Sequence, residues 1–158
     1  MFTAAVLVSS DRAFQGVYPD KSGVYLKDKL AELGYDVVDY SVLSDDYDKL
    51  KEKLEGHIKN EINLVLTSGG TGFSPRDVVP EATKAVIDRE VPGVSEAIRA
   101  KSLEITKNAM LSRATSGIKN KTWIVNLPGS RKAVEESLDI IAPVLEHGLG
   151  ILLGIADN

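Results

Sequence analysis

The 158-residue sequence contains no cysteine, and this absence excludes disulfides, thiolate metal sites and a cysteine nucleophile. Histidine is scarce as well: His57 and His147 fall in predicted helices, far from the loops described below, where surface positions are expected. No apolar stretch approaches the roughly 20 residues that cross a bilayer. The apolar run 3–8 has no basic segment before it, so no secretory signal is predicted and a cytoplasmic location is expected.

An excess of positive charge is also missing, since 19 Lys and Arg face 23 Asp and Glu for a formal net charge of −4. Broad attraction to nucleic acid or to an anionic membrane is therefore not expected. An anionic ligand has to be held locally, by backbone N–H groups, a few placed cations or a metal ion. The length and the 43% hydrophobic content predict one globular domain over residues 1–158.

Short apolar runs alternate with helical patterns along the chain. Strands are predicted at 3–8, 35–43 and 62–67, a hairpin at 113–118 and 122–127, and helices at 22–33, 46–59, 80–90, about 92–104 and 130–146, the last with a kink or early end at Pro143. This order predicts an α/β fold with right-handed crossovers and a mostly parallel sheet. Ligands of such folds bind beyond the carboxyl ends of the strands, here in loops 9–22, 44–46, 68–77 and 126–130.

The glycine-rich loop after the third strand is the central motif, TSGGTGFSPRD at 67–77. Its three glycines let the backbone approach a ligand closely and aim N–H groups inward, while Asp77 can hold a divalent ion. A tight turn whose glycines serve geometry alone is the alternative, and the added Arg76 and Asp77 favour an anion site. The Walker A and dinucleotide motifs are both absent. The candidate anion-binding residues are Ser68, Gly69, Gly70, Thr71, Gly72 and Arg76.

Three further loops carry candidate residues. In the loop after the first strand, a helix N-terminus beside a lysine favours phosphate or carboxylate, and a mobile loop with Ser22 as a helix cap is equally compatible with the sequence. The loop 126–130 opens a helix, where Ser130 serves either as a cap or as a phosphate contact. The candidate binding residues of these loops are Ser9, Ser10, Asp11, Lys21, Ser22, Gly23, Asn126, Pro128, Gly129 and Ser130.

Asp45 and Asp46 follow the second strand, where an acidic residue either caps the next helix or holds a metal. If the strand ends converge, Asp45 faces Asp77 across the site, and two carboxylates with phosphate oxygens make a Mg²⁺ site. Asp46 could take that place instead.

Several separated segments resemble the MogA/MoaB family of molybdenum-cofactor proteins, and the first loop and the SPRD segment are closer to MogA. These segments are SDR and GVYPDKSG within 10–23, TSGGTG at 67–72, RDV at 76–78, PEAT at 80–83, DREVPG at 88–93, LSR at 111–113 and NLPGS at 126–130. The resemblance implies a three-layer α/β/α fold and a homotrimer. It also implies Mg-ATP-dependent adenylylation of molybdopterin, with pyrophosphate released and the product handed to a molybdenum-insertion enzyme.

The essential aspartates of the family match Asp45 and Asp77, which the resemblance therefore implies as metal-holding, charge-stabilising groups. A MoaB-like protein that binds pterin or nucleotide without this catalysis, or a trimeric scaffold, is the alternative. One departure from the family pattern is Val79, which stands where threonine is usual. Weaker capping of the following helix is expected from it, without loss of activity.

Overall fold

The computed structural model describes residues 1–156 of the chain. In chain order the elements are β1 (Thr3–Ser9), α1 (Asp11–Phe14), α2 (Lys21–Glu32), β2 (Asp36–Leu43), α3 (Tyr47–Lys59), β3 (Leu64–Ser68), α4 (Val79–Val86), β4 (Arg89–Glu90), α5 (Pro92–Leu103), the 3-10 helix η1 (Lys107–Leu111), β5 (Ser116–Lys119), β6 (Thr122–Leu127) and α6 (Arg131–Leu152). Among the described residues, no helix is long and apolar enough to cross a membrane.

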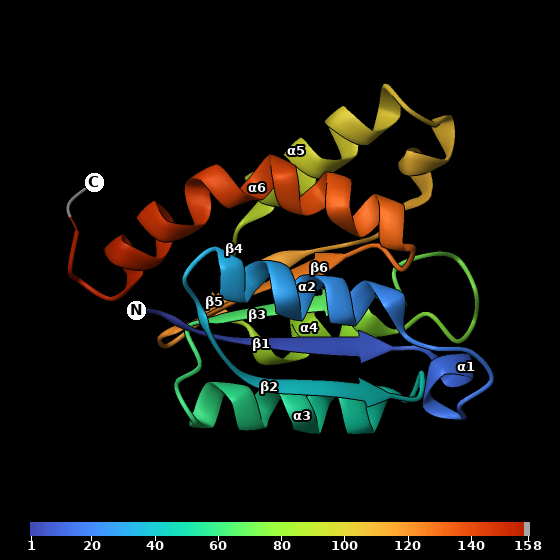
Figure 1. Cartoon of the computed structure of the whole chain (residues 1–158), viewed down its shortest axis with the longest axis horizontal. Helices are drawn as coiled ribbons and strands as arrows, with labels where there is room; N and C mark the ends of the chain where they lie inside the picture. Colours follow the sequence, from blue (N-terminus) through green and yellow to red (C-terminus); the bar gives the residue numbers. More distant parts are fainter. Residues whose placement is uncertain (157–158) are drawn as a thin grey trace.

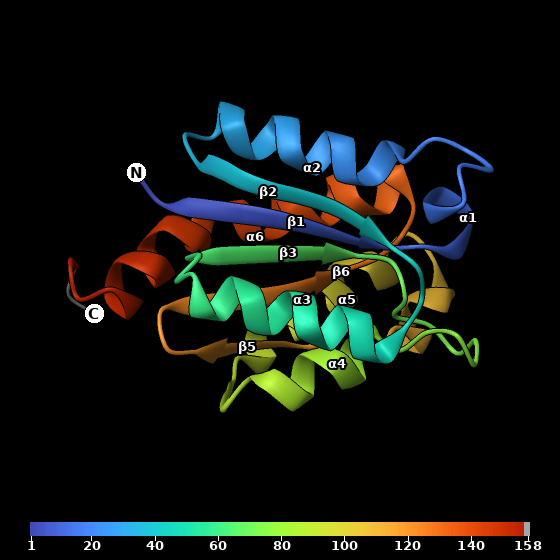
Figure 2. The same ribbon diagram turned by 90° about the horizontal axis from the view of Figure 1, so that it is seen from below.

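A six-stranded sheet of order β2-β1-β3-β6-β5-β4 forms the middle layer. The four strands β2, β1, β3 and β6 run parallel to one another, whereas β5 pairs antiparallel with β6 and with β4. Helices α2, α5 and α6 cover one face of the sheet, and α3 and α4 cover the other (Figures 1 and 2). The predicted three-layer α/β/α fold with an antiparallel hairpin is confirmed.

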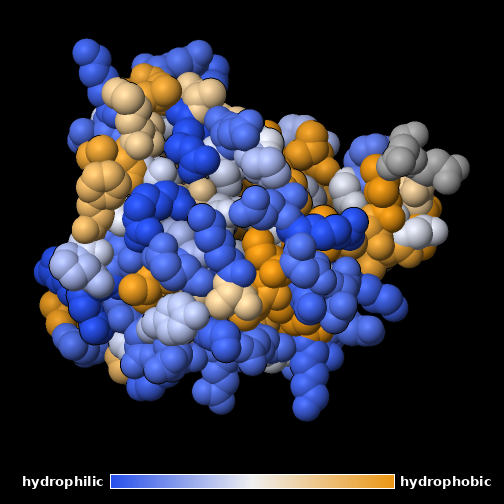
Figure 3. Space-filling view, turned by 180° about the vertical axis from the view of Figure 1, so that it is seen from behind, coloured by the Kyte–Doolittle hydropathy of each residue, from blue (hydrophilic) through white to orange (hydrophobic). Residues whose placement is uncertain are grey.

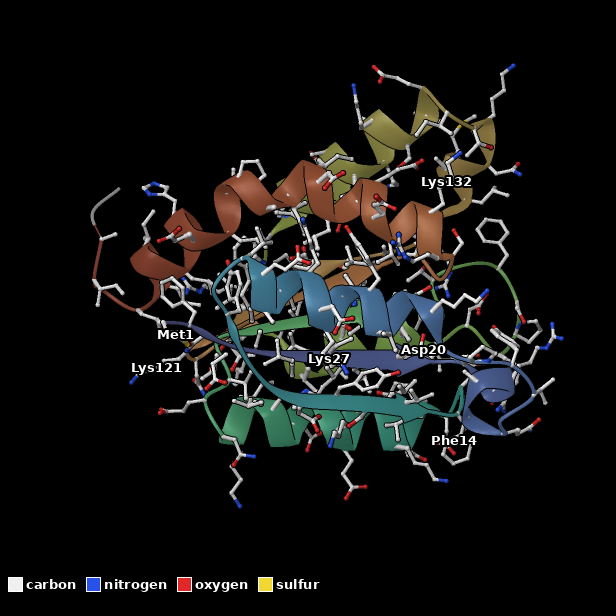
Figure 4. All side chains as sticks on the ribbon, viewed as in Figure 1. Met1, Phe14, Asp20, Lys27, Lys121 and Lys132 are labelled. Atoms are coloured by element: carbon white, nitrogen blue, oxygen red, sulfur yellow. The ribbon has the colours of Figure 1, made fainter. Side chains whose placement is uncertain are left out.

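The central strands are buried on both faces because helices pack on each side of them. Side chains of β1 alternate between the two cores: Val6 packs with Leu26 of α2, and Leu7 packs with Leu50 of α3. Parallel neighbours place their carboxyl ends at one edge of the sheet, and the loops that follow them lie there together. Figure 4 shows Phe14, Asp20 and Lys132 at this end of the molecule, and Met1 and Lys121 at the opposite end.

The structure differs from the predicted elements at two places on the outer side of the sheet. The helix predicted to reach residue 90 ends at Val86, because the next residue is extended and β4 then pairs with β5 through Arg89 and Glu90. The strand predicted to begin at residue 113 begins at Ser116, because Arg113 is engaged by the glycine-rich loop instead.

The last helix continues through Pro143 to Leu152, so the predicted early end at Pro143 is wrong. Pro143 and Asp139, four residues before it, are both exposed. Water can therefore reach the Asp139 carbonyl, which the proline leaves without an N–H partner. The short helices α1 and η1 were not predicted.

His57 is almost fully buried, and the expected surface position is wrong for this residue. It lies against β2, where its Nε2 is 2.9 Å from Asp39 Oδ2. Burial lowers the pKa of His57 and outweighs the opposing effect of the nearby Asp39 carboxylate. His147 is exposed on α6, as expected.

Candidate functional site

The four predicted loops meet at the carboxyl edge of the sheet and are tied to one another by hydrogen bonds. Ser68 Oγ donates to the Pro128 carbonyl at 2.9 Å, and Ser22 Oγ donates to the Gly129 carbonyl at 2.6 Å. Ser9 Oγ donates to Asp45 Oδ1 at 2.5 Å. Residues far apart in the sequence therefore form a single site.

The glycine-rich loop has the backbone that its sequence predicts. Gly69 and Gly70 have φ values of 90° and 68°, in the left-handed region that favours glycine. A Cβ at Gly69 would lie 2.5 Å from the Ser9 carbonyl oxygen, so the close approach of the two loops also requires glycine. A residue with a side chain could not replace Gly69 without moving the two loops apart.

The loop leaves a set of backbone donors without protein partners. Within residues 1–156, the N–H groups of Gly70, Thr71, Gly72 and Phe73 donate to no protein acceptor. Successive N–H groups in a loop with left-handed residues form a concave binding site for anions. The loop can therefore hold a phosphate through its main chain.

Asp45 faces the loop from the end of β2. Its carboxylate accepts hydrogen bonds from Ser9 Oγ and from the Asp11 N–H, and the Asp45 N–H in turn donates to Asp11 Oδ1 at 2.9 Å. Asp46 instead caps α3 by accepting from the Lys49 N–H at 3.1 Å. Of the two acidic residues, Asp45 is the one that lies in the site.

Asp11 and Arg76, both predicted to bind a ligand, form a bidentate ion pair with each other. Arg76 Nε and Nη2 each donate to the Asp11 carboxylate at 2.9 Å. The Arg76 guanidinium is the largest influence on Asp11 and holds the pKa of its carboxyl below the usual value. The ion pair joins the first loop to the glycine-rich loop and so holds the two loops together.

Asp77 closes the glycine-rich loop. Its Oδ2 accepts from the Ser74 N–H at 3.0 Å, and a Cβ at Gly72 would lie 3.0 Å from the same oxygen. At the other end of the loop, a Cβ at Gly70 would lie 3.3 Å from Ser9 Oγ, which donates to Asp45. Asp77 thus borders the glycine-rich loop directly, and Asp45 is linked to it through Ser9.

Three predicted ligand-binding side chains, Ser10, Ser22 and Asn126, already form hydrogen bonds within the protein. Ser22 donates to the Gly129 carbonyl, and Asp20 caps α2 in its place by accepting from the Gly23 N–H, so the predicted Ser22 cap is wrong. Ser10 caps α1. Asn126 is fully buried, and its amide joins Thr67, Thr83 and Thr115, which makes its side chain a brace for the strand ends.

Ser130 caps α6 through the Ala133 N–H at 3.2 Å, the simpler of its two predicted roles. Lys21 is exposed at the start of α2 and has no ion-pair partner within residues 1–156. α4 begins without a side-chain cap, but its N-cap residue is Val78, so the expected loss of a cap at position 79 falls one residue too late. Val79 is buried and packs against Gly70, where it supports the loop from beneath.

Two cavities flank the glycine-rich loop. One, of about 600 Å³, lies between the first loop and the Gly129–Ser130 turn and is lined by Ser9, Ser10, Lys21, Ser22, Ser68 and Gly69 among others. The other, of about 290 Å³, lies between α5, η1 and α6 beside Thr71 and Gly72, and much of its wall is apolar, including Ile98, Ile105, Ala109 and Leu111. The first cavity therefore offers more hydroxyl and charged side chains and the second more apolar ones, and we call them the polar and the apolar cavity.

Arg113 belongs to the site although its side chain was not among the predicted site residues. It donates to the Gly72 carbonyl from Nε and to the Asp77 carbonyl from Nη2, both at 2.8 Å. The only sequence signal was the LSR segment at 111–113, which is 41 residues from Gly72 and suggests no contact by itself.

Residues 5–147 match the sequence model of a family described as "Probable molybdopterin binding domain". The chain belongs to this family. Molybdopterin adenylyltransferase of Helicobacter pylori strain J99 is 38% identical over 152 residues, which cover 94% of this chain and 86% of the relative. Gephyrin of Dictyostelium discoideum is 37% identical over 93% of this chain, but the chain spans only 22% of that longer protein.

The fold of this family member also matches solved structures. The molybdopterin biosynthesis enzyme MoaB of Thermus thermophilus superposes with a TM-score of 0.91 and 39% identity, covering 98% of each chain. Relatives with the two names, adenylyltransferase and MoaB, are thus about equally similar to this chain. The predicted family is confirmed.

Proposed function

We propose that this chain transfers the adenylyl group of ATP to molybdopterin in molybdenum-cofactor biosynthesis. The observation that carries the proposal is the run of four N–H groups that have no partner among the described residues, with the Asp77 carboxylate at one end and the Ser9–Asp45 pair at the other. The similarity to the H. pylori adenylyltransferase over 94% of the chain supports it. In this reaction an oxygen of the terminal phosphate of molybdopterin attacks the α-phosphorus of ATP. The new P–O bond forms as the bond to the β-phosphate oxygen breaks, and pyrophosphate leaves.

The loop N–H groups of residues 70–73 hold the phosphates, and they favour the transition state because they are fixed before the substrate binds. Lys21 adds a positive charge at the edge of the polar cavity. Such a transfer is mostly positioning and charge stabilisation, so it needs no covalent intermediate on the protein.

Asp45 and Asp77 fit a role in holding Mg²⁺ together with ATP. Among the described residues no cluster of three acidic or histidine side chains could hold a metal alone. Two carboxylates completed by substrate phosphates and water are a common donor set for Mg²⁺. The ion, when bound, would offset negative charge on the phosphates, while the carboxylates fix its place beside the loop.

The two cavities suit the two substrates. We assign the polar cavity, with Lys21 and several serines, to phosphate-bearing parts. The more apolar cavity beside Thr71 suits a flat ring system, because ring faces gain from burial against Ile98 and Leu111. The phosphates of both substrates meet at the glycine-rich loop between the cavities.

A homotrimer in the cytoplasm, handing its product to a molybdenum-insertion enzyme, remains part of the proposal. Two exposed apolar side chains of α5 and η1 that do not line the apolar cavity, Leu103 and Met110, support a contact with another protein surface. Figure 3 shows hydrophobic atoms at the end of the molecule that carries these helices.

The second candidate is a MoaB-like protein that binds pterin or nucleotide, or a trimeric scaffold, without this catalysis. The 39% identity to the T. thermophilus MoaB favours it. A scaffold needs neither Asp45 nor Asp77, and this difference separates the two candidates experimentally.

The test is pyrophosphate release from Mg-ATP, with and without molybdopterin, by the wild-type chain and by Asp77→Asn. The amide keeps the size of the side chain but removes its charge, so turnover is expected to fall by about 100-fold or more. Asp88→Asn is the matched control, because Asp88 is exposed and pairs with Lys119 on the outer side of the sheet. Normal turnover by a folded Asp77→Asn protein would contradict the assignment. No release by the wild-type chain, despite molybdopterin binding, would favour the second candidate.

A further inference from the structure

Arg113 gathers the main-chain carbonyls of the glycine-rich loop. Its backbone N–H donates to the Thr71 carbonyl at 2.9 Å, its Nε to Gly72 and its Nη2 to Asp77. These three carbonyls belong to Thr71 and Gly72, beside the free N–H groups, and to Asp77, whose side chain is the carboxylate of the loop. A single side chain with its own backbone thus fixes both ends of the segment 71–77.

The direction of these carbonyls determines where the neighbouring N–H groups point. All peptide bonds of the described chain are trans, and in a trans peptide the C=O and the next N–H lie on opposite sides. Because the Thr71 and Gly72 carbonyls point at Arg113, the N–H groups of Gly72 and Phe73 point away from it. These are two of the four donors that lack protein partners within residues 1–156.

The guanidinium is charge-balanced, so it does not serve as an anion contact itself. Its Nη1 donates to Glu81 Oε2 at 2.6 Å. The hydrogen bond from Arg113 is the largest influence on Glu81 and lowers the pKa of its carboxyl. Nε, Nη1 and Nη2 all face protein acceptors, and Arg113 therefore acts through the loop.

We propose that the Arg113 side chain positions the phosphate-binding loop: through the Gly72 carbonyl it turns the Phe73 N–H group toward the substrate phosphates, and through the Asp77 carbonyl it fixes the main chain beside the Asp77 carboxylate. The role rests on the proposed function, since it concerns the same site. A planar fork of donors is required, because this one side chain donates to three separate acceptors, the Gly72 carbonyl, the Asp77 carbonyl and the Glu81 carboxylate. Lysine offers a single charged nitrogen on a flexible stem and cannot replace that fork.

The experiment compares Arg113→Lys and Arg113→Ala with the wild-type chain. For each protein, kcat and KM for Mg-ATP, Mg-ATP affinity by calorimetry and the melting temperature are measured. Arg113→Lys is expected to weaken Mg-ATP binding and to raise KM by about tenfold or more, from the loss of charge-assisted hydrogen bonds that orient the donors. Arg89→Lys, at an exposed arginine on β4, is the matched control and is expected to keep wild-type values.

Rescue separates positioning from a merely structural role. Guanidinium ion added at millimolar concentration is expected to restore part of the Mg-ATP affinity of Arg113→Ala, whereas sodium chloride of equal ionic strength is not. A folded Arg113→Lys protein with wild-type KM and affinity would overturn the proposal. It would also be overturned if affinity fell only in proportion to lost folding and guanidinium restored nothing. Absence of turnover in the wild-type chain would count against the proposed function alone, because the affinity comparison still tests Arg113.

Discussion

The first loop and the glycine-rich loop look alike in sequence, since both combine glycines, serines and charged residues, yet they do different work. In the first loop most polar side chains form hydrogen bonds within the protein, Ser9 with Asp45, Asp11 with Arg76 and Ser22 with Gly129, and Lys21 is the exception. In the glycine-rich loop Arg113 binds the carbonyls, while four N–H groups have no protein partner in the part of the chain that the structure describes. One loop braces the site, and the other supplies the donors.

This contrast shows that polar residues in a loop do not by themselves indicate ligand contacts. A hydroxyl or carboxylate at a strand end is as useful for joining two loops as for holding a substrate. What marks the glycine-rich loop is its backbone, because positive φ values at Gly69 and Gly70 expose successive N–H groups.

The comparison of the two loops predicts its largest effect, on both stability and turnover, when one glycine in each loop is replaced by alanine. Gly16 and Gly69 both have positive φ, but a Cβ at Gly16 meets nothing within 4 Å, whereas one at Gly69 meets the Ser9 carbonyl oxygen at 2.5 Å. Gly16→Ala is expected to lower the free energy of unfolding by roughly 1–2 kcal/mol, the cost of a left-handed backbone at alanine. Gly69→Ala is expected to cost more stability and to reduce turnover by about tenfold or more, because the loops must move apart.

Urea unfolding and pyrophosphate release measure the two effects of these glycine exchanges. Equal losses of stability and of activity in both variants would show that the close approach at Gly69 is unimportant. That result would remove the distinction between the loops.

A smaller effect, on stability, is expected at the cap of α2, which tests whether the first loop serves to hold the structure together. Asp20 accepts from the Gly23 N–H and from the Tyr40 hydroxyl, and its presence raises the pKa of Tyr40, in addition to the effect of burial. Asp20→Ala is expected to lower the free energy of unfolding by about 1 kcal/mol or more, while Asp20→Asn, which still caps, loses less than half of that. Denaturant unfolding of both variants checks this, and an equal loss in the two would show that the cap hydrogen bond contributes little to stability.

The smallest expected effect on turnover lies outside both loops, at His57 between β2 and α3. Burial lowers the pKa of His57, so the unfolded chain binds a proton more readily than the folded one. The free energy of unfolding should therefore be level above pH about 6.5 and decrease as the pH falls below it, since Lys53 also lies beside Asp39 and opposes a second positive charge. His57→Asn is expected to flatten this dependence and to leave turnover at pH 7.5 unchanged.

Unfolding free energies between pH 5 and pH 8 provide the measurement for His57. The same slope in the wild-type chain and in His57→Asn would show that another group causes the pH dependence. A large loss of turnover at pH 7.5 in a folded His57→Asn protein would extend the functional site beyond the two loops.

The sequence predicted the sheet and the place of the site well, because fully apolar runs such as residues 3–8 form buried parallel strands whose carboxyl ends converge. It could not predict β4, which has two residues and whose pairing with β5 depends on Gly117 rather than on a local pattern. Arg113 was missed because its partners lie 32 to 42 residues earlier in the chain. The choice between Asp20 and Ser22 as the cap depends on where α2 begins. The close packing of Gly23 against Val8 and Tyr40 sets that position, and no local pattern reveals it.

The most direct test of the account follows the backbone N–H resonances of an isotope-labelled chain while Mg-ATP is added. We expect the largest shifts at Gly70, Thr71, Gly72 and Phe73, the donors without protein partners within residues 1–156. The amides of Asn120 and Lys121, in the turn between β5 and β6 at the opposite end of the molecule, should shift much less. Large shifts in the first loop, with the glycine-rich loop unchanged, would contradict the claim that the main chain of residues 70–73 holds the phosphates.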